Sequence, residues 1–312
     1  MKKSKKTFLV TGGTGFIGSN ICKLLVKKNY NVKVFDNNFR GNVSKIKEIK
    51  TKLKFIKGDI RNKELLNKSL KNTDAVIHLA YVNGTKHFYS KPVLILDIAI
   101  KGMINVIDAC IKNKVKELYL ASSSEVYQTP IKIPTDETES LKIPDIFNPR
   151  YSYGGGKILT ELMGVHYGKQ YFKKLIIFRP HNVYGKNMGN EHVIPEFINR
   201  FKSLRGKSFK IQGSGNETRS FIYIEDFVQA FDLILTKGKH LNIYNIGTSE
   251  KIKIKDLAFK LAKIYKKKVL LKKTALAKGG TKIRLPDITK IKSLGFRKKF
   301  SLDKGLKKTL DI

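Results

Sequence analysis

The sequence predicts an α/β protein built on a doubly wound parallel sheet, with a smaller C-terminal α/β lobe. Three observations predict this architecture. Short, continuously apolar runs alternate with helical patterns through the first half of the chain, as is typical of parallel strands covered by helices on both faces. A loop with regularly spaced glycines joins the first apolar run to the first helical pattern. With 312 residues, the chain is long enough for one large domain and an appended lobe.

The expected elements follow from the periodicity of the apolar residues. The predicted strands are Thr7–Thr11, Val32–Phe35, Lys54–Lys57, Ala75–Leu79, Glu117–Ala121 and Leu175–Phe178. The predicted helices are Phe16–Lys28, Pro92–Asn113 and Tyr153–Tyr171. Residues 129–150 contain four prolines and are expected to form a loop. Beyond Arg179 the pattern loosens. We therefore expect residues 1–179 to form a Rossmann-type domain, to which later segments return, and residues 180–312 to form mainly the smaller lobe.

The formal net charge of +38 arises mostly from lysines spread along the whole chain. Nucleic-acid-binding proteins tend to gather charge in a patch and to use arginine, so no nucleic-acid partner is expected. The dispersed lysines are expected to reflect a solvated surface and a compositional bias, and the alternative is a positive field that attracts a polyanionic substrate such as a nucleotide diphosphate sugar. No apolar run reaches transmembrane length, and Cys22 and Cys110 fit small buried residues without metal-ligand spacing. We expect a cytoplasmic protein that binds neither a membrane nor a metal.

The glycine loop is the first candidate site. Gly12, Gly15 and Gly18 are three residues apart between the first strand and the first helix. Such glycines permit a tight turn, a close backbone approach to a pyrophosphate, and close packing of helix on sheet. Phe16 and Ile17 begin the helix, whose free N–H groups and positive dipole end suit phosphates. The loop therefore predicts a dinucleotide site.

Residues at the ends of the next strands complete the expected cofactor site. Asp36, followed by Asn37, stands where a carboxylate binds the adenosine ribose hydroxyls and repels a 2′-phosphate, which favours NAD over NADP; the alternative is a turn aspartate. Asp59 could accept a hydrogen bond from the adenine amino group, or cap the helical segment from Asn62. The other residues expected to line this site are Ile60, Leu79 and Ala80.

A catalytic constellation follows the fifth strand. Ser122–Ser124 end that strand, and Tyr153 and Lys157 lie one turn apart at the start of a helix, on one face. A phenol is a poor base near neutrality, but the lysine ammonium one turn away, with the cationic nicotinamide nearby, favours the phenolate. Tyr153 could then remove a proton from a hydroxyl as hydride leaves the same carbon for NAD, while a serine holds the oxygen.

Taken together, these motifs resemble the extended short-chain dehydrogenase/reductase family, in its nucleotide-sugar epimerase/dehydratase branch, over essentially the whole chain. The resemblance implies that NAD stays bound and is recycled, and that Ser123 is the catalytic serine. It implies that Glu125 is the candidate base in members that eliminate water, with Ser124 in place of an aspartic acid; the alternative for Glu125 is a local hydrogen bond. The chain departs from the family at Asp97, Gln128 and Gly156, the last of these standing where the family often has serine.

The resemblance also implies a substrate side. Asn182, in Asn182-Val183-Tyr184-Gly185, would contact the sugar or diphosphate of a nucleotide diphosphate sugar, and Arg219 and Arg284 would bind its phosphates. The alternative for each arginine is a surface salt bridge. Val193 and Ile194 could line the nucleotide pocket.

The sequence thus predicts an NAD-dependent nucleotide-sugar epimerase or 4,6-dehydratase that oxidises the sugar, typically at C4, through Ser123, Tyr153 and Lys157. An NAD(P)-dependent keto-sugar reductase and a non-catalytic NAD-binding protein are the alternatives. The residues Pro92–Asn113 and Tyr153–Tyr171 resemble helices that form a four-helix bundle in family dimers, so a homodimer is expected.

Overall fold

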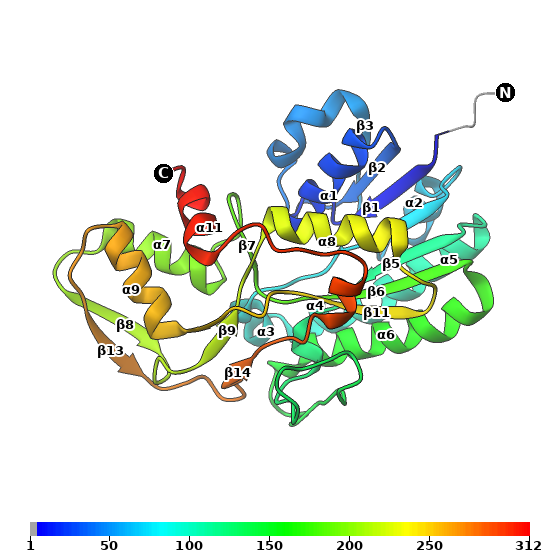
Figure 1. Ribbon diagram of the computed structural model, residues 1–312. Helices are drawn as coiled ribbons and strands as arrows, with labels where there is room; N and C mark the ends of the chain where they lie inside the picture. The colour runs from blue at the N-terminus through cyan, green and yellow to red at the C-terminus, as the bar shows by residue number, and fades with distance from the viewer. Residues whose placement is uncertain (1–4) are drawn as a thin grey trace.

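The computed structural model describes residues 5–312. Within them, a seven-stranded parallel sheet has the order β11-β6-β5-β4-β1-β2-β3 (Figure 1). Its strands are β1 (Thr7–Thr11), β2 (Asn31–Asp36), β3 (Leu53–Lys57), β4 (Ala75–His78), β5 (Glu117–Ala121), β6 (Lys174–Pro180) and β11 (Asn242–Ile246). Thr11 of β1 is in register with Phe35 of β2 and with His78 of β4, so the carboxyl ends of these strands meet at one edge.

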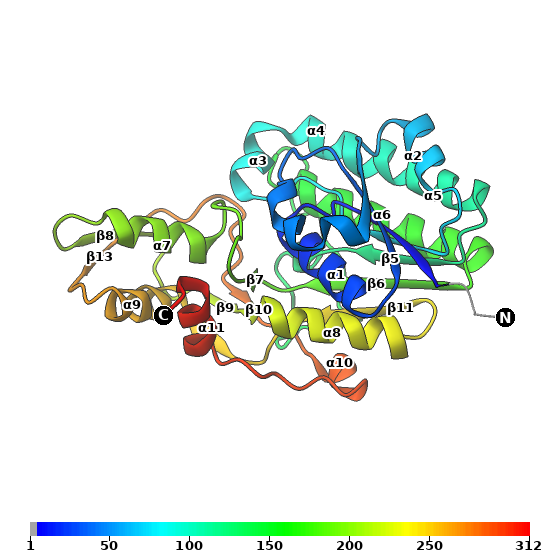
Figure 2. The ribbon, with the colours of Figure 1, turned by 90° about the horizontal axis from the view of Figure 1, so that it is seen from above.

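Two layers of helices bury the sheet because successive side chains of each strand point to opposite faces. Phe8 and Val10 of β1 belong to one apolar cluster, and Leu9 between them belongs to the other. The first cluster includes side chains of α1 (Phe16–Lys27) and α8 (Ile224–Lys237). The second includes side chains of α2 (Lys63–Ser69), α5 (Met103–Lys112) and α6 (Tyr151–Tyr171). Figure 2 separates the two layers.

The predicted helix Pro92–Asn113 is wrong in one respect, because it is not a continuous α-helix. It consists of α4 (Pro92–Asp97), a π-helical segment over Ile98–Gly102, and α5. Gly102 packs on Ile60, where a Cβ would lie 2.4 Å from the Ile60 Cδ1 atom. Apolar periodicity does not reveal a single π turn, since the helix continues on both sides of it.

Other bounds differ by two residues at most, as helix and strand ends commonly do. Helix α6 begins at Tyr151, two residues before the predicted start, and β6 extends to Pro180. The short helices α3 (Thr85–Ser90) and η1 (Val43–Lys52, a 3-10 helix) were not predicted.

The smaller lobe lies beyond the carboxyl edge of the sheet (Figure 1). Its elements are β7 (Val183–Tyr184), α7 (Val193–Ser203), β8 (Ser208–Gln212), β9 (Thr218–Ser220), β10 (Ile222–Tyr223), β12 (Lys251–Lys253), α9 (Ile254–Ile264), β13 (Leu270–Thr274) and β14 (Ile283–Arg284). The chain ends with α10 (Thr289–Ser293) and α11 (Leu302–Leu310). Segments after residue 180, namely α8 and β11, lie on or in the large sheet. The domain boundary at 179/180 stays a prediction.

None of the helices within residues 5–312 combines the length and apolar character needed to cross a membrane.

Candidate active site

A cavity of about 420 Å³ lies at the carboxyl edge of the sheet, facing the smaller lobe. Ligands bind at this edge in doubly wound folds, and the volume is in the usual range for ligand sites. The predicted site residues that line it are Gly12, Gly15, Phe16, Ile17, Gly18, Asp36, Asn37, Asp59, Ile60, Leu79, Ala80, Ser123, Glu125, Tyr153, Lys157, Asn182, Val193 and Arg284. The fold therefore brings together all but one of the residues expected from the sequence.

The glycine loop has the geometry that a dinucleotide requires. Gly12 has a positive φ of 72°, and a Cβ there would lie 2.7 Å from the backbone nitrogen of Ala80. At Gly18, a Cβ would lie 2.2 Å from the carbonyl oxygen of Gly12, so any side chain would push the helix away from the loop. The loop thus leaves open backbone at the N-terminus of α1, where phosphates bind.

Asp36 lies at the end of β2 and is 7% exposed. Its Oδ2 atom accepts a hydrogen bond from the backbone of Thr14 at 2.9 Å, and its Oδ1 atom accepts one from Asn38 at 2.8 Å. The carboxylate therefore shapes the glycine loop and the following turn while it also lines the cavity. Asn37 donates from Nδ2 to Asp59 at 3.0 Å, linking the second and third strand ends.

Asp59 does not cap the next helix. Asn62 occupies that position and accepts from the backbone of Leu65 at 3.0 Å. Asp59 instead accepts from the Nε and Nη2 atoms of Arg61 at 3.0 and 2.9 Å. The side-chain hydrogen bond from Arg61 lowers the pKa of Asp59 in spite of partial burial. Both carboxylate oxygens thus already accept hydrogen bonds from Arg61 and Asn37, and a bond from the adenine amino group stays a prediction.

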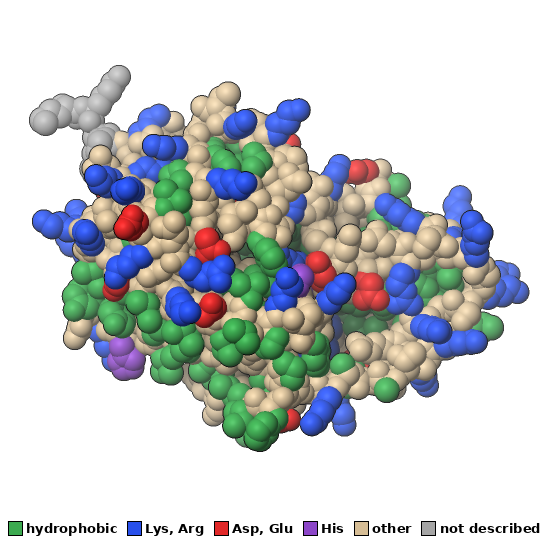
Figure 3. Space-filling view, turned by 180° about the vertical axis from the view of Figure 1, so that it is seen from behind, with side chains coloured by type: hydrophobic (Ala, Val, Ile, Leu, Met, Phe, Trp, Pro, Cys, Tyr) green, Lys and Arg blue, Asp and Glu red, His purple; other side chains and the backbone are tan. Residues whose placement is uncertain are grey.

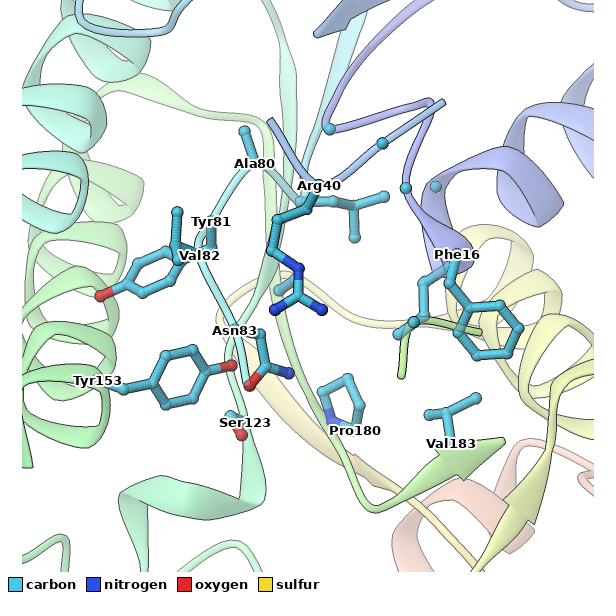
Figure 4. Close-up of a pocket in the computed structure, with 18 of the residues that line it drawn as sticks. Phe16, Arg40, Ala80, Tyr81, Val82, Asn83, Ser123, Tyr153, Pro180 and Val183 are labelled. Atoms are coloured by element: carbon cyan, nitrogen blue, oxygen red, sulfur yellow. The ribbon is translucent and has the colours of Figure 1, made fainter. Parts of the chain in front are cut away.

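Tyr153 and Ser123 meet at the floor of the cavity (Figure 4). The Tyr153 hydroxyl points into the cavity beside Ser123 and Asn83. Burial raises the pKa of Tyr153 above its usual value, while a hydrogen bond with Ser123 and the charge of Arg40 act in the opposite direction. Burial is the largest of these effects, and the expectation that Lys157 and a bound nicotinamide favour the phenolate stays a prediction.

Lys157 is 3% exposed and donates from Nζ to the carbonyl oxygen of Ala121 at 2.6 Å. Burial lowers its pKa to about 7, although the carboxylate of Glu161 acts to raise it. The Nζ atom lies 6.0 Å from the centroid of the Tyr153 ring. Lys157 therefore changes charge near neutral pH, beside the candidate base.

Glu125 is held in an ion pair. Its Oε1 atom accepts from Nη1 of Arg284 at 2.8 Å, and Oε2 lies 3.7 Å from Nη2 of Arg150. Burial raises the pKa of Glu125, but the charges of these two arginines outweigh burial and hold the pKa below its usual range. The local interaction considered for Glu125 is thus present, and Arg284 is its main partner.

Arg219 is the predicted site residue that does not line the cavity. Its Nη1 and Nη2 atoms donate to the carbonyl oxygens of Thr218 and Thr281 at 2.9 and 2.8 Å. Its charge acts on Glu125, so it lies behind Arg284 in the same basic cluster. A role for Arg219 toward a substrate phosphate stays a prediction.

The substrate-side residues Asn182, Val193 and Ile194 line the cavity as expected. Asn182 has a positive φ of 40° and donates from Nδ2 to the carbonyl oxygen of Ser220 at 2.9 Å. The side chain therefore also ties β7 to β9 and β10, and fixes the loop that faces the cofactor side.

Arg40 is a cavity residue that no sequence motif predicts. Its guanidinium points into the centre of the cavity (Figure 4), where Nη2 pairs with Glu191 at 2.8 Å. The Nη1 atom is buried and finds no hydrogen-bond partner within residues 5–312. The sequence offered one signal for Arg40, namely that arginine is rare in this lysine-rich chain and that this one lies four residues after Asp36. Arg40 and Glu191 join the cofactor side to the smaller lobe.

Comparisons with known proteins agree with this site. The family model described as "NAD dependent epimerase/dehydratase family" matches residues 8–247. A "dTDP-D-glucose 4,6-dehydratase" of Dictyostelium discoideum is 34% identical over 82% of this chain, which spans 61% of that relative's length. A "Putative UDP-glucose 4-epimerase" of Methanocaldococcus jannaschii is 33% identical over 97% of both chains. The structure of a UDP-glucose 4-epimerase from Thermotoga maritima, solved with UDP-glucose, aligns with a TM-score of 0.88 at 30% identity, over 98% of this chain and 97% of that one. The predictions of the fold class and of NAD as cofactor are confirmed.

Proposed function

Because the chain belongs to the NAD dependent epimerase/dehydratase family, we propose that it is a nucleotide-sugar 4-epimerase that inverts C4 of a nucleotide diphosphate hexose. The family includes both epimerases and dehydratases. The Methanocaldococcus jannaschii relative, which aligns over 97% of both chains, is named a putative UDP-glucose 4-epimerase. The proposal assigns chemistry to Ser123, Tyr153 and Lys157, which line one cavity with the glycine loop.

Each group would have a defined task. Tyr153 would take the proton from the C4 hydroxyl as the C4–H bond breaks, and return it when that bond reforms on the other face. Ser123 would hold the C4 oxygen through its hydroxyl, which stabilises the charge that develops there. Lys157 would contribute positive charge next to Tyr153. The glycine loop and Asp36 would hold NAD, which would supply reversible hydride transfer at C4, so that no net oxidation would occur.

The observation that favours epimerisation over dehydration is the ion pair of Glu125 with Arg284. A base that removes a proton from C5 must give up its present partners, and a carboxylate with a lowered pKa is a weak base. The neighbouring Ser124 hydroxyl is also a poor acid for protonating a leaving hydroxyl. In this proposal Glu125 orients Arg284, whose guanidinium would bind a substrate phosphate.

The test is to incubate the protein with UDP-, dTDP-, GDP- and CDP-hexoses and analyse products by mass spectrometry and proton NMR. A C4 epimer of unchanged mass is expected. A product lighter by one water would establish a dehydratase and overturn the proposal. Absence of turnover with NAD bound would favour the reductase or the non-catalytic alternative.

Glu125→Gln gives a second, independent readout. The amide keeps the shape of the side chain and removes its charge, so an epimerase should lose activity mainly through a higher KM, as Arg284 becomes less well held. A dehydratase that uses Glu125 as base should lose about two to four orders of magnitude in kcat. Loss of kcat on that scale would contradict a purely orienting role for Glu125.

We also infer that the protein forms a homodimer through a four-helix bundle. Supporting this, apolar side chains are exposed along α4, α5 and the π segment between them, and along α6: Val93, Leu96, Ile100, Ile104, Leu162 and Tyr171. Figure 3 shows hydrophobic side chains gathered on this side of the large domain. Contiguous exposed apolar surface of this kind commonly marks an interface.

A cytoplasmic location is the last part of the proposal. The buried, unpaired thiols of Cys22 and Cys110 suit a reducing compartment. Fractionation of cells that express the protein would test it, and recovery in a membrane or external fraction would contradict it.

A further inference from the structure

Tyr81 lies between the two groups that the proposed reaction needs. It follows the end of β4 and lines the cavity. The Nζ atom of Lys157 lies over its ring, 3.9 Å from the centroid. The ring of Tyr153 stands perpendicular to it, with the centroids 5.2 Å apart. One side chain thus contacts both Lys157 and Tyr153.

The contact with Lys157 involves the ring face and not a negative charge. Burial raises the pKa of Tyr81 well above its usual value, so the phenol is neutral. Its hydroxyl points away from the cavity (Figure 4), and its oxygen is buried without a hydrogen-bond partner in the described part of the chain. The aromatic face and the Ala121 carbonyl therefore stabilise the buried ammonium, together with the charge of Glu161.

Gly156 makes room for this arrangement. A Cβ at Gly156 would lie 2.3 Å from the Tyr81 hydroxyl oxygen and 2.8 Å from the Cβ atom of Ala99. Gly156 is thus the residue that permits the Tyr81 side chain to pack against helix α6 beside Lys157.

We propose that Tyr81 is a positioning residue, whose ring face keeps the Lys157 side chain charged and in place and whose packing fixes the ring of Tyr153. The inference rests on the proposed function for its catalytic meaning. The packing of Tyr153 is completed on its other side by Phe88, which is stacked on it with centroids 4.7 Å apart. Among the described residues, the rings that lie near the Lys157 Nζ atom are those of Tyr81 and Tyr153 and not that of Phe88, so Phe88 provides a matched control.

Other charged and titratable groups face Lys157 and stay unchanged when Tyr81 is replaced. Glu161 on α6 acts to raise the pKa of Lys157. His78 at the end of β4 is buried, and its pKa is lowered to about 3 by burial and by Lys157, so it is neutral. Removing the Tyr81 ring therefore removes one stabilising contact of the ammonium and should lower the pKa of Lys157.

The experiment compares Tyr81→Phe, which keeps the ring, with Tyr81→Leu, which removes it. The pKa of Lys157 is measured by competitive labelling with acetic anhydride across a pH series, followed by peptide mass spectrometry. We expect the labelling midpoint to fall by about one pH unit in Tyr81→Leu and to stay unchanged in Tyr81→Phe and Phe88→Leu. Tyr81→Met replaces Tyr81→Leu if the latter does not fold.

The activity readout is separate. With a nucleotide sugar that the wild type epimerises, the alkaline limb of the kcat/KM profile should move to lower pH in Tyr81→Leu and not in Tyr81→Phe. An unchanged Lys157 midpoint in Tyr81→Leu, or an equal shift in Tyr81→Phe, would overturn the inference. A different outcome is possible, in which Tyr81→Leu lowers the Lys157 labelling midpoint but the wild-type protein turns over no nucleotide sugar. That outcome would refute the proposed function and leave the role of Tyr81 toward Lys157 standing.

Discussion

Burial acts on the two central side chains in opposite directions. It raises the pKa of the acidic Tyr153 and lowers that of the basic Lys157, so each is driven toward its neutral form. The positive charges of Arg40 and Arg284 oppose this effect at Tyr153. The reactive state of the site therefore depends on the cations around the cavity, several of which come from the smaller lobe or pair with it.

The lowered pKa of Lys157 gives a stability prediction. The unfolded chain keeps a lysine proton up to about pH 10.4, whereas the folded chain releases it near pH 7. Between these values the unfolded state binds more protons, so the Lys157 contribution to stability rises with pH. Relative to Lys157→Met, the wild type should gain about 2 kcal/mol of unfolding free energy between pH 7 and pH 9.

Urea unfolding at several pH values measures this difference. Lys169→Met, at the exposed far end of the same helix, is the control and should show a difference that does not vary with pH. If the difference in unfolding free energy between the wild type and Lys157→Met also does not vary with pH, the pKa of Lys157 is not lowered in the folded state.

Helix α6 places Tyr153 and Lys157 on one face, and the intervening Gly154-Gly155-Gly156 lowers helix propensity for a packing reason. Gly156→Ala would favour the helix intrinsically by about 1 kcal/mol but would force its Cβ against Tyr81 and Ala99. We expect net destabilisation of about 1–3 kcal/mol. Gly155→Ala, whose Cβ would meet only the flexible end of Ile143 at 3.1 Å, should be neutral or stabilising in thermal unfolding.

The expected destabilisation would be contradicted if Gly156→Ala were as stable as the wild type, or more stable, in thermal unfolding. In that case Tyr81 moves aside without loss, and the close packing of Tyr81 and Ala99 on α6 does not constrain the helix.

The elements of the first domain were predictable because parallel strands are continuously apolar and the loops between them are marked by glycine, aspartate and proline. Glu117–Ala121 was predicted to the residue. The π segment at Ile98–Gly102 was not, since it alters hydrogen bonding without altering the apolar pattern. The residues of the site were predictable where a motif fixes their spacing. Arg40 and Tyr81 were not, because only tertiary packing brings them to the cavity, and the pairing of Arg40 with Glu191 could not be predicted for the same reason.

At the scale of the whole molecule, positive charge and apolar surface are distributed differently. Lysines cover the surface widely, whereas the exposed apolar side chains of α4, α5 and α6 lie on one side (Figure 3). A positive field over the molecule should attract nucleotide diphosphate sugars and repel a second copy at long range. Apolar contact at short range must therefore stabilise a dimer against this repulsion.

The dimer should thus strengthen with salt, because screening weakens the repulsion and leaves apolar contact intact. Light scattering at micromolar concentration should show a dimer in about 0.15 M salt. The double variant Ile104→Glu/Leu162→Glu should be monomeric, because it places charges on exposed positions of α5 and α6 where the proposed bundle would form. Phe259→Glu, at an exposed apolar position of α9 in the smaller lobe, should leave the dimer intact. A monomeric wild type, or a dimer lost equally in Phe259→Glu, would place the interface elsewhere or remove it.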